Sequence, residues 1–139
     1  MRVVLDTNVV VAAFRSRRGA SRPILEAALR GRFDLLLSVP LALQYEEVLT
    51  RPKQLAAIRL TIEEIAQVLR SLFSICKPVE IRYLWRPHLR DPDDELVLEA
   101  AINGRADCMV TFNERDFAGA GSFDLKIVRP SVFLGMMES

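Results

Sequence analysis

Short apolar runs alternate along the chain with stretches whose apolar residues recur at helical spacing. Residues 2–5, 35–37 and 108–111 are runs of apolar, often β-branched residues that are too short for buried helices. Ile127-Val128 forms a last short run directly before the segment that begins at Pro130. These four runs predict buried strands, with a helix starting at Pro130.

Helix boundaries are marked by local signals between these strands. The capping signals are Ser38 with Pro40 in the first turn, the capping box Thr61-Ile62-Glu63-Glu64, and Asp91 with Pro92 and two further acids. The first of these helices should run to about Arg51, because Pro52 cannot continue it, and the third should end at Gly104. A further helix follows Asp6 at once, and another is expected from near Pro23 to Gly31.

Strands that alternate with helices indicate a parallel sheet. We therefore expect one α/β domain over residues 1–139, with a three-layer α/β/α fold and a central, mainly parallel sheet. The stretch from Cys76 to His88 is mixed, and we place one strand there, around Val79 to Ile81.

Composition limits the classes of function. The net charge of +1 gives no global field that attracts nucleic acid, so such binding has to be local. One basic stretch contains Arg15, Arg17, Arg18 and Arg22, and it is either a solvated loop or a contact to phosphate or to a partner. A second stretch, residues 82–86, interleaves basic and aromatic side chains, which either pack on the domain or bind single-stranded nucleic acid. The two cysteines have no metal-binding spacing. No membrane span or signal peptide is recognisable, so we expect a cytoplasmic protein.

Acidic residues follow the predicted strands repeatedly. Asp6 ends the first strand, Asp116 lies after the strand at 108–111, and the helix after residue 37 carries Gln44, Glu46 and Glu47. Asp94 belongs to the same edge, because its helix runs antiparallel to the strands. In an open parallel sheet the functional crevice lies at the carboxyl ends of the strands. Carboxylates gathered there repel one another unless a cation neutralises them, and oxygen ligands favour Mg²⁺ or Mn²⁺ over zinc.

Each acid also has an ordinary structural interpretation. Asp6 and Asp91 are suitable helix caps, and Asp93 and Asp94 complement a helix dipole. Asn113 and Asp116 are common in turns. The metal-site hypothesis rests on the convergence of several acids at one edge.

Three segments resemble a known family. They are Val3-Val4-Leu5-Asp6-Thr7-Asn8, Arg90-Asp91-Pro92-Asp93-Asp94, and Val110-Thr111-Phe112-Asn113-Glu114-Arg115-Asp116-Phe117. Together, in this order, they resemble PIN domains, and in particular the VapC-like toxins of toxin–antitoxin modules. The resemblance covers essentially the whole chain.

The resemblance implies a Mg²⁺- or Mn²⁺-dependent ribonuclease. Its metal ligands match Asp6, Asp94 and Asp116, with Thr111 and Asn113 supporting the site, and Asp93 is the alternative to Asp94. It also implies an RNA substrate, a small antitoxin protein as partner, and a homodimer.

The chain departs from the family pattern at one position. Gln44 stands where the family has a glutamate. An amide carries no charge and cannot take a proton as a base. Glu47 lies one turn further along the same side of the helix and is a candidate substitute. Two rival functions therefore stay open: a DNA or structure-specific nuclease of the same fold, and a catalytically weakened PIN domain that serves as a binding module.

Overall fold

Among the described residues, the sheet has five strands and is parallel throughout. The computed structural model describes residues 1–82, 91–117 and 124–138, and within these residues the strand order is β3-β2-β1-β4-β5. The strands are β1 (Arg2–Leu5), β2 (Asp34–Leu37), β3 (Lys77–Pro78), β4 (Cys108–Val110) and β5 (Lys126–Val128). All pairings between neighbours are parallel. The carboxyl ends of β1 and β4 therefore lie side by side at the centre of one edge.

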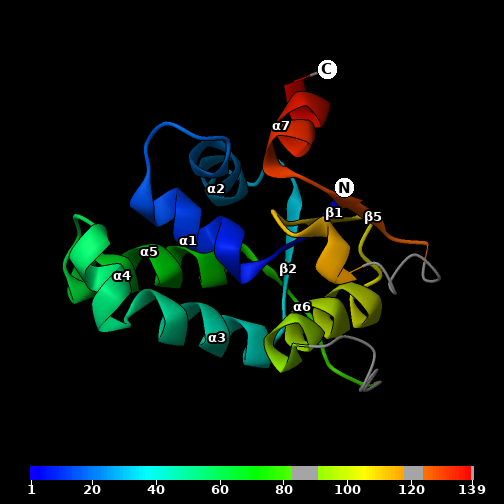
Figure 1. Ribbon diagram of the computed structural model, residues 1–139. Helices are drawn as coiled ribbons and strands as arrows, with labels where there is room; N and C mark the ends of the chain where they lie inside the picture. The colour runs from blue at the N-terminus through cyan, green and yellow to red at the C-terminus, as the bar shows by residue number, and fades with distance from the viewer. Residues whose placement is uncertain (83–90, 118–123, 139) are drawn as a thin grey trace.

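Helices cover both faces of this sheet. They are α1 (Thr7–Arg15), α2 (Ser21–Leu29), α3 (Val39–Leu49), α4 (Pro52–Ala57), α5 (Ile62–Ile75), α6 (Pro92–Asn103) and α7 (Pro130–Glu138). In Figure 1, β2 lies between α1 and α2 on one side and α6 on the other. This arrangement confirms the predicted three-layer α/β/α fold.

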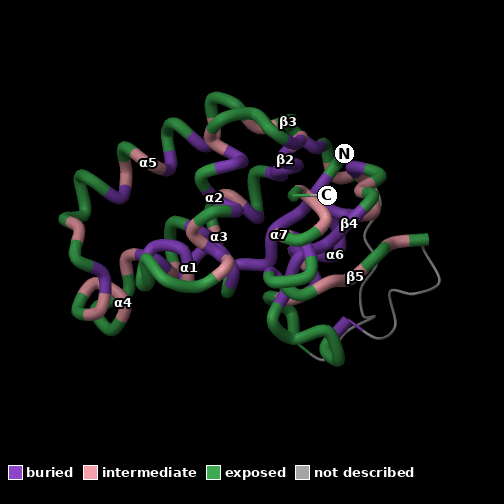
Figure 2. Tube along the Cα trace, turned by 90° about the horizontal axis from the view of Figure 1, so that it is seen from above, coloured by how far each residue is buried: buried purple, intermediate pink, exposed green. Residues whose placement is uncertain are grey.

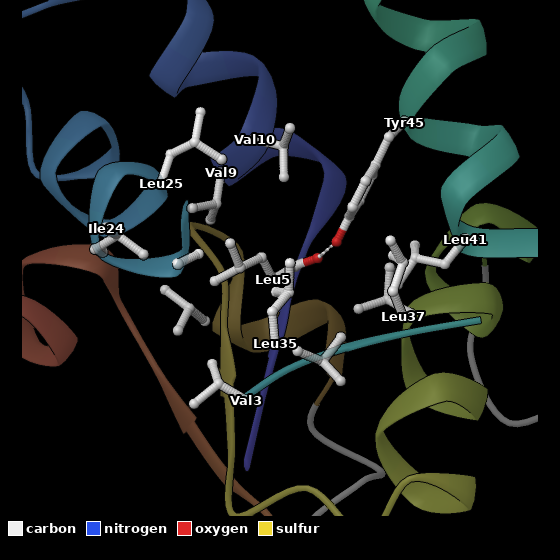
Figure 3. Close-up of a cluster of buried hydrophobic side chains, with 14 of the residues drawn as sticks. Val3, Leu5, Val9, Val10, Ile24, Leu25, Leu35, Leu37, Leu41 and Tyr45 are labelled. Atoms are coloured by element: carbon white, nitrogen blue, oxygen red, sulfur yellow. Dashed lines mark hydrogen bonds between the residues drawn. The ribbon is translucent and has the colours of Figure 1, made fainter. Parts of the chain in front are cut away.

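The alternation of side chains along the strands explains the layers. Figure 3 shows Val3, Leu5, Leu35 and Leu37 in one buried cluster with side chains from α1 and α2. Leu36 points to the opposite face of the sheet, toward α6. Its Cδ1 atom approaches Gly104 at the end of α6 so closely that a Cβ added to Gly104 would lie 2.9 Å from it. The strands are thus apolar on both faces, as the uninterrupted leucine run requires.

The predicted capping signals are confirmed. The Ser38 hydroxyl accepts a hydrogen bond from the Leu41 amide at 3.2 Å, and the side chains of Thr61 and Glu64 form both bonds of the capping box. Gly31 adopts φ +70°, the left-handed conformation that ends α2 and is open to glycine without strain.

Two sequence predictions are wrong in detail. Helix α3 ends at Leu49 rather than about Arg51, and α4 begins directly at Pro52, because proline is as suitable at the first position of a helix as it is unsuitable inside one. The edge strand is Lys77–Pro78 rather than Val79 to Ile81. Pro78 is tolerated there because an edge strand needs backbone donors on one side only.

Burial follows the layers. Figure 2 shows buried segments along β2, β4, α1 and α6, whereas β5, α4 and α5 are largely exposed or half-buried. Among the described helices, none is both long and apolar enough to span a bilayer. Most of the basic and aromatic stretch at residues 82–86, together with His88, falls within residues 83–90, which lie outside the described residues.

Candidate functional site

Asp6 is fixed where β1 meets α1. Its amide donates to the Val110 carbonyl of β4 at 2.9 Å, which continues the ladder between the two strands. From α3, the buried Tyr45 hydroxyl donates to the Leu5 carbonyl, as the dashed line in Figure 3 shows. The Asp6 side chain is only 3% exposed. A carboxylate is thus held in the interior at the carboxyl edge of the sheet.

Thr111 and Asn113 support this carboxylate through a chain of hydrogen bonds. The Thr111 hydroxyl donates to Asp6 Oδ2 at 2.7 Å and accepts from the Asn113 amide at 3.0 Å. Because the Thr111 oxygen accepts the hydrogen bond from the Asn113 amide, the hydroxyl proton of Thr111 is free to point to Asp6. The family resemblance implies a supporting role for both residues; the structure links Thr111 to Asp6 through its side chain, and Asn113 to Thr111 through its backbone amide.

The environment of Asp6 resists its negative charge. Burial raises the pKa of Asp6, and the charge of Asp116 raises it further, whereas the Thr111 bond and the amides of Thr7 and Asn8 lower it. Asp6 occupies the N-cap position of α1, but its side chain makes no capping hydrogen bond. The Asp6 carboxylate therefore lies near the first amides of α1, which lower its pKa, without forming a capping hydrogen bond by geometry.

Asp116 is presented by a short turn after β4. The Asp116 amide donates to the Asn113 carbonyl at 3.0 Å, and the adjacent Phe117 side chain is fully buried. Buried Thr111 at one end and buried Phe117 at the other anchor the segment. The Asp116 residue itself stays exposed.

The start of α6 separates the roles of its three aspartates. Asp91 is the cap, because its Oδ1 atom accepts from the Asp93 amide at 2.9 Å. Asp93 is exposed, whereas Asp94 is half-buried. Burial, followed by the charge of Asp6 and then those of Asp91, Asp116 and Asp93, raises the pKa of Asp94 to about 7. Of the two neighbours, Asp94 is thus the residue whose charge is coupled most strongly to Asp6.

The structure brings Asp6, Asp94 and Asp116 into one electrostatic neighbourhood, since each pair is coupled through these pKa shifts. Within residues 1–82, 91–117 and 124–138, no three Asp, Glu, His or Cys side chains are arranged to hold a metal ion directly. Mg²⁺ commonly uses one or two protein carboxylates and keeps several waters. These mutually repelling carboxylate oxygens therefore fit such an ion better than zinc.

Gln44 lies on α3, one residue before Tyr45. Its side chain is half-buried, and its Oε1 atom is buried without a hydrogen-bond partner among the described residues. A buried acceptor without a donor is costly. A water or cation at this position would satisfy it.

Glu47 does not join the group of acids. It forms a bidentate ion pair with Arg51, at 2.9 Å from Nε and 2.7 Å from Nη2, and about 60% of its side chain is exposed. Arg51 lowers the pKa of Glu47. Glu47 is not among the charges that shift the pKa of Asp6 or Asp94. Arg51 is also influenced by the charge of Asp93, so the segment between α3 and α4 lies near the start of α6.

Tyr45 and Arg51 were missed by the sequence analysis. Burial and the charge of Asp6 raise the pKa of Tyr45 well above its usual value, so the hydroxyl remains a donor. The i, i+4 spacing of Glu47 and Arg51 is a recognisable signal for an ion pair. Nothing in the local sequence indicates that Tyr45 reaches the end of β1.

Comparison with known proteins assigns the fold to a family. Residues 2–115 match the family model described as PIN domain, and the chain belongs to the PIN-domain family. The fold is similar to the crystal structure of VapBC2 from Rickettsia felis bound to a DNA fragment from their promoter, with a TM-score of 0.60 and 17% identity over 93% of this chain and 98% of that one. Among curated proteins, no match is found.

Proposed function

We propose that this protein is a Mg²⁺- or Mn²⁺-dependent endoribonuclease and the toxin of a toxin–antitoxin pair. The observation that carries the nuclease assignment is the position of Asp6, Asp94 and Asp116 at the carboxyl edge, where burial and then the neighbouring acids raise the pKa of Asp94 to about 7. Membership of the PIN-domain family supports it. The fold shared with VapBC2 supports the toxin role and an antitoxin partner.

Asp6 and Asp94 would hold the divalent cation directly, and Asp116 would contact the waters that the cation keeps. When bound, the cation would stabilise charge on a phosphoryl oxygen and acidify water at the site. The Thr111 hydroxyl donates a hydrogen bond to Asp6 Oδ2, which orients the carboxylate. Tyr45 holds the end of β1, so the position of Asp6 does not depend on the ligand.

Cleavage assays on the purified protein test the nuclease assignment. The same single-stranded sequence is supplied as RNA and as DNA, with Mg²⁺, with Mn²⁺ or with EDTA. We expect RNA to be cleaved only with metal, and Asp6→Asn or Asp94→Asn to abolish cleavage. The matched control is Asp93→Asn, which removes an exposed carboxylate from the same turn and should leave cleavage largely intact.

The outcomes distinguish the rival functions. Preferential cleavage of DNA would replace the RNA assignment, and binding without cleavage would identify a binding module, for which Gln44 is the structural reason. The toxin role is tested in cells. Expression should arrest growth, Asp6→Asn should abolish the arrest, and a co-expressed antitoxin should relieve it, whereas harmless expression of an enzyme active in vitro would refute it.

A further inference from the structure

A second polar site lies at the far end of α1. A pocket of about 410 Å³ is lined by five arginines, Arg15, Arg17, Arg18, Arg22 and Arg59. Among the described residues, no acidic side chain lines it. We call it the arginine pocket. Because the whole chain carries a net charge of only +1, this is a strong local concentration of positive charge.

Two of the five arginines have a role in the fold. Arg15 is in the last turn of α1, where a cation complements the helix dipole, and Arg22 donates from Nε to the Ala13 carbonyl at 2.8 Å. The other three, Arg17, Arg18 and Arg59, are exposed, and they take part in none of the ion pairs formed between described residues. Like charges held together in this way repel one another unless an anion binds between them.

The start of α2 adds a second feature that favours an anion. Helix α2 begins at Ser21 beside the pocket, has no acid in its first turn, and is preceded by Ala20, which provides no side-chain cap. The buried Ser21 hydroxyl has no hydrogen-bond partner among the described residues. A helix N-terminus without a cap offers free amides and the positive end of the helix dipole, which is a common anion site.

The position of the pocket relative to Asp6 indicates which anion. Helix α1 begins directly after Asp6 and ends at Arg15, so at 1.5 Å per residue the two ends are about 13 Å apart. This distance corresponds to about four phosphates at the ~3.4 Å rise of one helical strand. Guanidinium groups match phosphate oxygens with paired hydrogen bonds.

We propose that the arginine pocket binds backbone phosphates of the nucleic-acid strand whose cleaved bond lies at Asp6 and Asp94. This inference rests on the proposed nuclease function and extends it. The pocket would recognise the strand without reading its sequence, because phosphate contacts position a strand and base contacts specify it.

The test measures the salt dependence of strand binding. Fluorescence anisotropy with a 12-nucleotide single-stranded RNA is carried out in the Asp6→Asn background, so that cleavage does not interfere. The variant is Arg17→Gln with Arg18→Gln, which spares Arg15 and Arg22 and therefore the turn between α1 and α2. The matched control is Arg30→Gln with Arg32→Gln, two exposed arginines outside the pocket, which changes net charge equally. Arg59→Gln is an independent second variant on another segment.

The expected result is a loss of phosphate contacts. The slope of log affinity against log salt should become shallower by about 0.7 for each contact removed, and so by about 1.4 in the Arg17/Arg18 variant. The control should keep the original slope. Lengthening the RNA from two to twelve nucleotides should raise the affinity of the starting protein, and the variant should lose most of this rise, because only the longer strand spans the distance to the pocket.

Equal slopes for the Arg17/Arg18 variant and the starting protein would overturn the inference, as would an equal decrease in the control. Polyglutamate serves as a second probe, for an acidic protein partner. If the Arg17/Arg18 variant loses binding to polyglutamate while its salt slope for RNA is unchanged, the inference is overturned and the pocket is assigned to such a partner. If the protein binds RNA through the pocket but cleaves nothing, the proposed function fails and the pocket remains a nucleic-acid site. If it cleaves RNA and the slope is unchanged, only the pocket inference fails.

Discussion

Removing the charge of Asp94 should stabilise the metal-free protein, by an amount that grows with pH. Burial and the neighbouring acids raise its pKa from a usual value of 3.8 to about 7. A carboxyl group with a raised pKa in the folded state contributes stability that is fully present below the unfolded-state value and is lost as pH rises through the folded-state value. The folded protein therefore carries its full penalty at pH 8, and Asp94→Asn removes that penalty.

The raised pKa sets the upper limit of the effect. The difference between 3.8 and about 7 corresponds to at most ~4 kcal/mol at pH 8. Because the side chain is only half-buried, solvent screening reduces this to about 1–2 kcal/mol. For a domain of this size the gain amounts to about 3–7 °C in Tm. At pH 5 less than half of the gain should remain.

Thermal unfolding in EDTA at pH 5 and pH 8 measures the effect. Asp93→Asn is the control, because Asp93 is exposed in the same helical turn and its charge favours the helix dipole, so its removal should leave Tm unchanged or lower it slightly. Addition of Mn²⁺ should raise Tm in the starting protein and much less in Asp94→Asn. An equal Tm gain at both pH values, or an equal gain in Asp93→Asn, would refute the electrostatic explanation.

Three further predictions concern the residues around Asp6. Thr111→Val should lower cleavage and reduce the free energy of unfolding in urea by about 1–3 kcal/mol, because it removes the hydrogen-bond donor to Asp6. Thr111→Ser is the control, because it retains this donor. Tyr45→Phe should cost about 1–2 kcal/mol by the same measurement, since the Leu5 carbonyl loses its buried donor, and an unchanged midpoint would contradict this role. Gln44→Glu should raise cleavage rates at limiting Mn²⁺ while Glu47→Gln leaves them unchanged; the opposite result would assign the acid's role to Glu47.

The parts of the fold that were predictable from sequence are those set by local interactions. Asp91 caps α6, and Thr61 and Glu64 form a capping box. Both could be predicted because the two partners of each bond lie within three residues of each other. Strand β3 was misplaced because its pairing is determined by Leu36 and Leu37 on β2, and its own two residues carry no strand pattern. Edge strands of this kind are specified mainly by their neighbour.

The candidate site was predictable only as far as topology reaches. That Asp6 and Asp94 lie at one edge follows from where strands end and helices begin, whereas the bond between Thr111 and Asp6 joins residues 105 positions apart. That bond requires β4 to lie directly beside β1, and the sequence does not contain the strand order. The distinction between Asp93 and Asp94 likewise required the burial of each side chain.

The charge balance of α3 explains why the site depends on three acids. Gln44 and Glu47 lie one turn apart on one side of α3, and Arg51 follows just beyond the end of the helix, where it pairs with Glu47. Arg51 is coupled to Asp93, which places it near the start of α6, but Arg51 also neutralises Glu47. With an amide at Gln44, this side contributes no net negative charge. The attraction for a divalent cation therefore comes from Asp6, Asp94 and Asp116, which favours one tightly held ion and a weaker second one.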